Sequence, residues 1–89
     1  MAKITVMIKN KKPIVIEGLD LDNNTINDIL SKVREKEPNL IVNLITISGE
    51  DISDFSKKCK DVGLEDEDIF LISDYYNGGH KYYTKIKNI

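Results

Sequence analysis

The sequence predicts an α+β domain in which one helix packs across a mixed sheet of four to five strands. Three observations support this fold class. Residues 25–37 have the hydrophobic period of a helix, apolar runs typical of strands lie on both sides of them, and polar turn residues separate these runs. A hairpin followed by a crossover helix and returning strands forms such a sheet, with the helix on one face.

The first two strands are expected to form a hairpin. Residues 3–9 alternate, with Ile4, Val6 and Ile8 on one side, which is typical of a half-buried strand. Residues 10–13 are polar turn residues that end in Pro13, and residues 14–17 resume a β-branched run. Two such runs joined by a short polar link indicate a hairpin.

The helix is expected over residues 25–37. Its apolar residues fall at i, i+3, i+4 and i+7 and form one stripe: Ile26, Ile29, Leu30 and Val33. Thr25 and Asp28 have the spacing of a capping box, and Pro38 favours an end at the preceding residue. The stripe must be covered, so the helix should lie across the sheet.

The second half of the chain supplies the remaining strands. Residues 44–48 are the expected strand after the helix, with residues 40–42 packing on the way in, and residues 69–72 are the most hydrophobic strand. Residues 52–64 are predicted to be irregular, with short turns or one short helix around residues 55–60. Residues 65–68 are all acidic and are expected to form a solvated turn.

The composition indicates one globular domain inside the cell. The chain has 89 residues, 40% of them hydrophobic and 31% charged, and it contains no apolar run long enough for a membrane span and no signal peptide. A net charge of −2 with interspersed signs argues against nucleic acid as a partner. Cys59 is the only cysteine, so we expect no disulfide within the chain and a small buried hydrophobic residue at this position.

Residues 3–79 resemble the ubiquitin-like β-grasp family. The resemblance rests on the helix start at Thr25-Ile26, the apolar strand ending at Gly49, the run from Asp61 to Ile72, and Gly78-Gly79 where ubiquitin-like modifiers carry a terminal double glycine. The last half is also similar to the small ubiquitin-like component of bacterial type VII secretion systems, which lacks the double glycine. The resemblance implies a domain at residues 1–79, a tail or extra hairpin strand at residues 80–89, and Leu64, Phe70 and Ile72 in the core.

The chain departs from ubiquitin where most ubiquitin partners dock. The resemblance places Lys11 or Lys12, Thr46 and Ser73 at the positions of ubiquitin's apolar patch. Because desolvated apolar groups dominate such interfaces, a generic ubiquitin receptor should bind this chain poorly.

Gly78 and Gly79 have two interpretations. As the conjugation site of a modifier precursor they would need a peptidase that cuts after Gly79, followed by activating and conjugating enzymes, because residues 80–89 follow. A sulfur carrier of the same fold would need the same exposed glycine. Alternatively, residues 77–79 form a hairpin loop between residues 74–76 and a returning strand at residues 80–86, since Asn-Gly between such runs is a strong hairpin signal.

Ile69 and Leu71 are the candidates for binding other proteins. They should point away from the face that Phe70 and Ile72 occupy, because side chains alternate along a strand. They either pack against a neighbouring segment or form an apolar binding surface flanked by Tyr75 and Tyr83, since tyrosine is enriched at interfaces.

The remaining polar groups do not suggest a catalytic or metal-binding site. The acidic run at residues 65–68 lacks the alternating ligands and central glycine of a calcium loop, and His80 has no cysteine, serine or second histidine to act with. The lysines are expected to form a solvated face. We therefore predict a non-catalytic protein that binds other proteins and uses no metal, cofactor or membrane.

Overall fold

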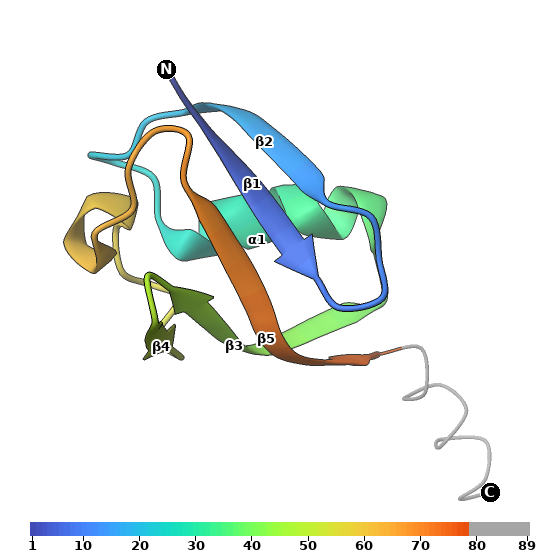
Figure 1. Cartoon of the computed structure of the whole chain (residues 1–89). Coiled ribbons are helices and arrows are strands. Elements are labelled where there is room, and N and C mark those ends of the chain that lie inside the picture. Colours follow the sequence, from blue (N-terminus) through green and yellow to red (C-terminus); the bar gives the residue numbers. More distant parts are fainter. Residues whose placement is uncertain (79–89) are drawn as a thin grey trace, which may run out of the picture.

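The computed structural model describes residues 1–78, which form one mixed sheet and one α-helix (Figure 1). The elements in chain order are β1 (Ala2–Ile8), β2 (Ile14–Leu19), α1 (Ile26–Lys36), β3 (Leu40–Ile47), β4 (Glu50–Ile52), the short 3-10 helix η1 (Cys59–Val62) and β5 (Ile69–Asn77). The strand order is β2-β1-β5-β3-β4. Only β1 and β5 run parallel, and the other neighbours are antiparallel. The predicted fold class is confirmed.

The helix covers one face of the sheet with the predicted stripe. Ile26, Ile29, Leu30 and Val33 are at most 1% exposed, and they share one core with inward-facing strand residues such as Val6 and Phe70. None of the side chains described as buried is polar or charged. Burial of a complete apolar stripe is the main source of stability for a chain of this size.

Both ends of α1 follow the sequence signals. The Thr25 side chain accepts a hydrogen bond from the Asp28 amide at 3.2 Å, and the Asp28 carboxylate accepts one from the Thr25 amide at 2.9 Å. This reciprocal pair is the predicted capping box. The helix ends at Lys36, with Glu37 as the C-cap before Pro38.

The strands after the helix differ from the prediction. β3 begins at Leu40 rather than at residue 44, because residues 40–42 pair with the end of β5. The prediction also missed β4, which is joined to β3 by Ser48 and Gly49 with φ values of 50° and 82°. Positive φ at both loop residues is typical of a tight two-residue hairpin turn, and glycine adopts it without strain.

The irregular crossing holds the start of the helix in place. Its only helix among the described residues is at Cys59–Val62, further along than the predicted residues 55–60. The carbonyl oxygens of Phe55 and Lys57 accept hydrogen bonds from the Asn27 and Ile26 amides at 2.8 and 3.0 Å. These are amides of the first helical turn, which have no partner within the helix. Cys59 is fully buried, and burial raises the pKa of its thiol to about 11.

The last strand is longer than predicted. β5 runs to Asn77, and the Gly78 amide donates to the carbonyl of Asn39, the residue before β3. Leu64, Phe70 and Ile72 lie in the core, as the resemblance implied. The proposed return arm at residues 80–86 lies outside the described residues.

Candidate protein-binding surface

Four apolar side chains lie together on the face of the sheet that α1 does not cover. We call them the outer apolar patch: Met7, Val15, Ile69 and Leu71, which are 37%, 49%, 61% and 42% exposed. They come from three adjacent strands and alternate with buried residues such as Val6 and Phe70. Alternation along each strand therefore puts them on one surface.

The strand register makes this patch continuous. Met7 lies directly opposite Leu71, and Thr5 lies between Val15 on one side and Ile69 on the other. Directly opposed residues in neighbouring strands have side chains in contact range on the same face. The patch is thus one apolar block around the Thr5 side chain.

A hydrogen-bonded polar cluster borders the patch on the β3 side. Thr46 lies opposite Leu71, and its hydroxyl donates to the Asp51 carboxylate at 2.9 Å. The Ser73 hydroxyl lies 2.9 Å from that of Thr46. A partner that covered these groups would have to replace the hydrogen bonds that they make to water, so the apolar surface ends here.

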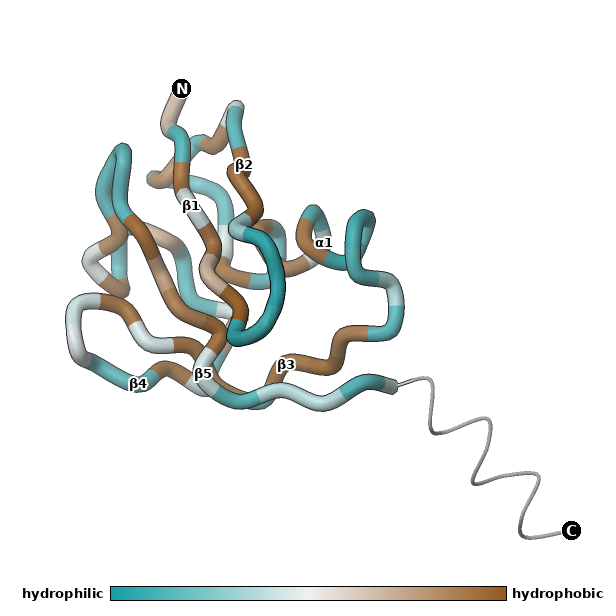
Figure 2. The backbone as a smooth tube through the Cα atoms, turned by 45° about the vertical axis from the view of Figure 1, so that its right-hand side comes forward, coloured by the Kyte–Doolittle hydropathy of each residue, from teal (hydrophilic) through white to brown (hydrophobic). Residues whose placement is uncertain are grey.

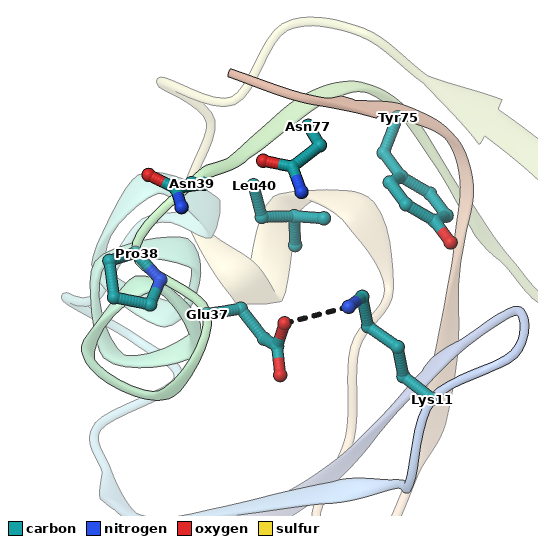
Figure 3. Close-up of a pocket in the computed structure, with 7 residues that line it drawn as sticks. All are labelled: Lys11, Glu37, Pro38, Asn39, Leu40, Tyr75 and Asn77. Atoms are coloured by element: carbon teal, nitrogen blue, oxygen red, sulfur yellow. Dashed lines mark ion pairs between the residues drawn. The ribbon is translucent and has the colours of Figure 1, made fainter. Parts of the chain in front are cut away.

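Tyr75 does not flank the patch. Its ring packs against the core, and its hydroxyl donates to the Lys9 carbonyl at 2.8 Å. It lines a separate cavity of about 290 Å³ at the end of the helix, with Lys11, Glu37, Pro38, Asn39, Leu40 and Asn77 (Figure 3). The structure therefore brings Ile69 and Leu71 together and puts Tyr75 elsewhere. Tyr83 lies outside the described residues.

An ion pair closes one side of that cavity. The Lys11 ammonium and the Glu37 carboxylate point toward one another, 2.9 Å apart (Figure 3). The hydrogen bond to Glu37 raises the pKa of Lys11. Figure 2 shows that the turn between β1 and β2, which carries Lys11, is hydrophilic. The ion pair connects this turn to the end of the helix, and the Tyr75 hydroxyl connects it to β5.

Gly78 is packed into the end of the sheet. A Cβ atom built on it would lie 2.8 Å from the Ile41 Cγ1 atom and 3.1 Å from the Asn39 carbonyl oxygen. Its amide is hydrogen-bonded to that same oxygen. Glycine thus fits a close backbone approach here. Gly79 and His80 lie outside the described residues.

The acidic segment at residues 65–68 forms a structural turn. The Asp68 carboxylate accepts from the Glu65 amide and the Asp66 carboxylate from the Lys3 amide, both at 2.8 Å. Among residues 1–78, no three histidine, cysteine or acidic side chains are grouped so that they could hold a metal ion. Within the same range there is no helix long and apolar enough to cross a membrane.

Comparison with known proteins decides the fold. Neither protein-family models nor curated protein sequences match the chain. The structure matches the ubiquitin-like domain of an Arabidopsis thaliana protein, determined by NMR in solution, with a TM-score of 0.65 and 15% sequence identity. The match covers 86% of this chain and 77% of the other. The fold is a ubiquitin-like β-grasp.

The order of the strands explains which residues of the outer apolar patch the sequence analysis missed. Met7 and Val15 belong to the same surface as Ile69 and Leu71, but only the latter two were predicted. The signal for Met7 and Val15 is weak: each is an apolar residue at an outward position of a strand whose inward positions are also apolar. Their proximity to β5 depends on the strand order, which puts β1 between β2 and β5.

Proposed function

We propose that this ubiquitin-like protein is a non-catalytic binding module that docks other proteins on the outer apolar patch. The observation that carries the proposal is the joint exposure of Met7, Val15, Ile69 and Leu71 on one face of the sheet. Contact with a partner would remove this apolar area from water. This burial contributes a favourable free energy of roughly 25 cal/mol per Å². Such binding requires no catalytic group.

The position of the patch favours partners other than ubiquitin receptors. Thr46 and Ser73, which the resemblance aligned with ubiquitin's apolar patch, are engaged in the polar cluster with Asp51. The apolar area lies beside them, over β5, β1 and β2. A receptor shaped for ubiquitin would thus meet hydroxyl groups where ubiquitin presents apolar side chains. This difference favours a different set of partners.

A point charge in the patch tests the proposal. Leu71→Asp should keep the fold, because the side chain is 42% exposed, and should abolish partner binding, because the carboxylate would be desolvated at the interface. Ser31→Asp puts the same charge on the exposed side of α1 and should bind as the wild type does. The measurement is affinity purification from the native cells with quantitative mass spectrometry. Equal recovery of every partner by both variants would exclude the outer apolar patch as the binding site.

The modifier and sulfur-carrier alternatives require a free terminal glycine at residue 79. The packing of Gly78 gives that residue a structural reason to be glycine, independent of conjugation. The intact mass of the protein from its own cells separates these alternatives from the binding module. A chain that still carries residues 80–89 supports the binding module, whereas a chain ending at residue 79, or a ladder of adducts, supports a processed modifier.

A further inference from the structure

The pair Asn77-Gly78, at the end of β5, has a reactivity that the outer apolar patch does not involve. An asparagine side chain can lose ammonia when the backbone nitrogen of the following residue attacks it. The reaction is fastest when that residue is glycine, because no Cβ atom then blocks the approach. Every other asparagine in the chain is followed by a residue with a side chain. Asn77 is thus the asparagine of this sequence that is most reactive toward deamidation.

The structure holds this pair in an unreactive geometry. Asn77 pairs with Leu40 at the start of β3, and the Gly78 amide donates its hydrogen to the Asn39 carbonyl. The same nitrogen must lose that hydrogen and reach the Asn77 side chain before the reaction can begin. The space around Gly78 is also tight, since a Cβ atom there would lie 2.8 Å from the Ile41 Cγ1 atom. The reaction therefore requires the end of β5 to separate from β3.

We propose that Asn77 is a site of spontaneous deamidation whose rate is controlled by opening of the β3–β5 end. In the open state the Gly78 nitrogen attacks the side-chain carbonyl carbon of Asn77, and a bond forms between these two atoms. The side-chain amide group leaves as ammonia and takes the proton that the Gly78 nitrogen loses, so a five-membered imide ring remains. Water reaches the exposed Asn77 and opens the ring at either carbonyl, which gives aspartate or isoaspartate. No atom is oxidised or reduced.

Both products change the end of the sheet. Each adds one negative charge to a chain with a net charge of −2, at a residue that lines the cavity beside Glu37 (Figure 3). Isoaspartate also inserts the Cβ carbon into the main chain, so the Gly78 amide no longer meets the Asn39 carbonyl in register. Ladder hydrogen bonds depend on the regular spacing of main-chain groups. Formation of isoaspartate therefore releases the end of β5 from β3 irreversibly.

The opening that controls the reaction is local. The ends of secondary-structure elements open at a lower free energy than the core, so the rest of the sheet stays folded. The rate in the folded protein equals the rate in the unfolded chain multiplied by the open fraction. We expect the folded rate to be at least about tenfold lower, which corresponds to an opening free energy of about 1.4 kcal/mol.

Incubation of the full chain at neutral pH, with and without urea, tests the proposal. Deamidation raises the mass of the peptide that contains Asn77 by about one dalton, and labelling by protein isoaspartate methyltransferase identifies the isoaspartate product. In urea the wild type should react at Asn77 before its other asparagines, and in the folded protein this reaction should be slowed as stated. Asn77→Gln should show no modification at this position in either state, because the longer side chain closes a ring far more slowly.

A variant in β3 tests whether the local opening controls the rate. Ile41→Gly weakens the strand beside Gly78, so deamidation of the folded protein should be several-fold faster than in the wild type. The rate in urea should be unchanged, because residue 41 is far from Asn77 in the sequence. Ile52→Gly is the matched control. Ile52 is also a partly exposed isoleucine of the sheet, but it pairs with Ile45, away from the opening, and its variant should react as the wild type does.

Four results would overturn the inference. Asn77 might stay intact in urea, the folded wild type might react as fast as the chain in urea, Ile41→Gly might react no faster than the wild type, or both glycine variants might be accelerated equally. The last result would assign the opening to global unfolding rather than to the end of β5. None of these results involves the outer apolar patch, so the proposed function is tested separately.

Discussion

At the scale of single residues, the glycine at position 78 has two explanations. It allows close packing in the fold, and it would be part of the conjugation site of a modifier. Gly78→Ala should lower the free energy of unfolding by about 1 kcal/mol, at the low end for overpacking, since the nearest side chain is the partly exposed Ile41. Urea denaturation measures the change. In an Ile41→Ala background the same substitution should cost less, because the Cγ1 and Cδ1 atoms it would meet are gone. An equal decrease of the free energy of unfolding in both backgrounds would show that the added methyl group makes no tight contact with Ile41.

Asp28 should make stability depend on pH in acid. Its hydrogen bond from the Thr25 amide is the largest cause that lowers its pKa from 3.8. A carboxyl group with a lowered pKa in the folded state contributes stability that is complete above its unfolded pKa and is lost as pH falls through the folded value. Asp28→Asn should therefore flatten the dependence of the urea midpoint on pH below about pH 4.

A second carboxylate in the same region provides the control for Asp28. Asp22 is exposed in the linker before α1, and its side chain makes no hydrogen bond within the described residues. Asp22→Asn should leave the pH dependence as in the wild type. If both variants flattened the curve equally, general charge rather than the capping box would be responsible.

At the scale of elements, α1 is the part of the fold whose loss should unfold the chain. Ile29 is 0% exposed and faces the sheet, so Ile29→Asp would bury a carboxylate without a partner, at a cost of at least about 3 kcal/mol. We expect loss of the cooperative unfolding transition by circular dichroism. Ser31→Asp, on the exposed side of the same helix, should retain it.

The helix could be predicted because its signals are local. The stripe, the capping box and Pro38 all lie within 14 residues, residues 25–38, and the structure has each where the sequence indicated. β3 and β4 could not be delimited in this way. Residues 40–42 are strand because they pair with residues 75–77, far along the chain, and β4 is only three residues long. The Ser48-Gly49 turn was the one local signal for β4.

The binding surface was harder to predict than the fold for a related reason. Ile69 and Leu71 follow from alternation within one strand, whereas Tyr75 breaks the expected pattern. The β3–β5 register shifts between Val42 and Ile45, and Tyr75, beyond that irregularity, packs against the core. A register shift of this kind depends on the pairing of two strands and leaves little trace in either sequence alone.

At the scale of the whole molecule, the residues that the structure describes form one hydrophobic core between the helix and the sheet. Its buried apolar side chains run from Ala2 to Ile72, and the last backbone contact described is that of Gly78 with Asn39. The domain boundary expected after residue 79 stays a prediction that truncation of the chain can test. It also leaves the outer apolar patch entirely within the first 79 residues.

A chain of residues 1–79 should consequently unfold cooperatively, with a free energy of unfolding within about 0.5 kcal/mol of the full chain, the usual limit for changes away from the core. Urea denaturation of both chains measures the difference, and Gly78→Ala in the shorter chain shows whether its end remains packed on Ile41. A loss of several kcal/mol on truncation would contradict the boundary and assign residues 80–89 to the fold. Equal stability would leave those residues free for processing or binding, which the intact mass from the native cells then distinguishes.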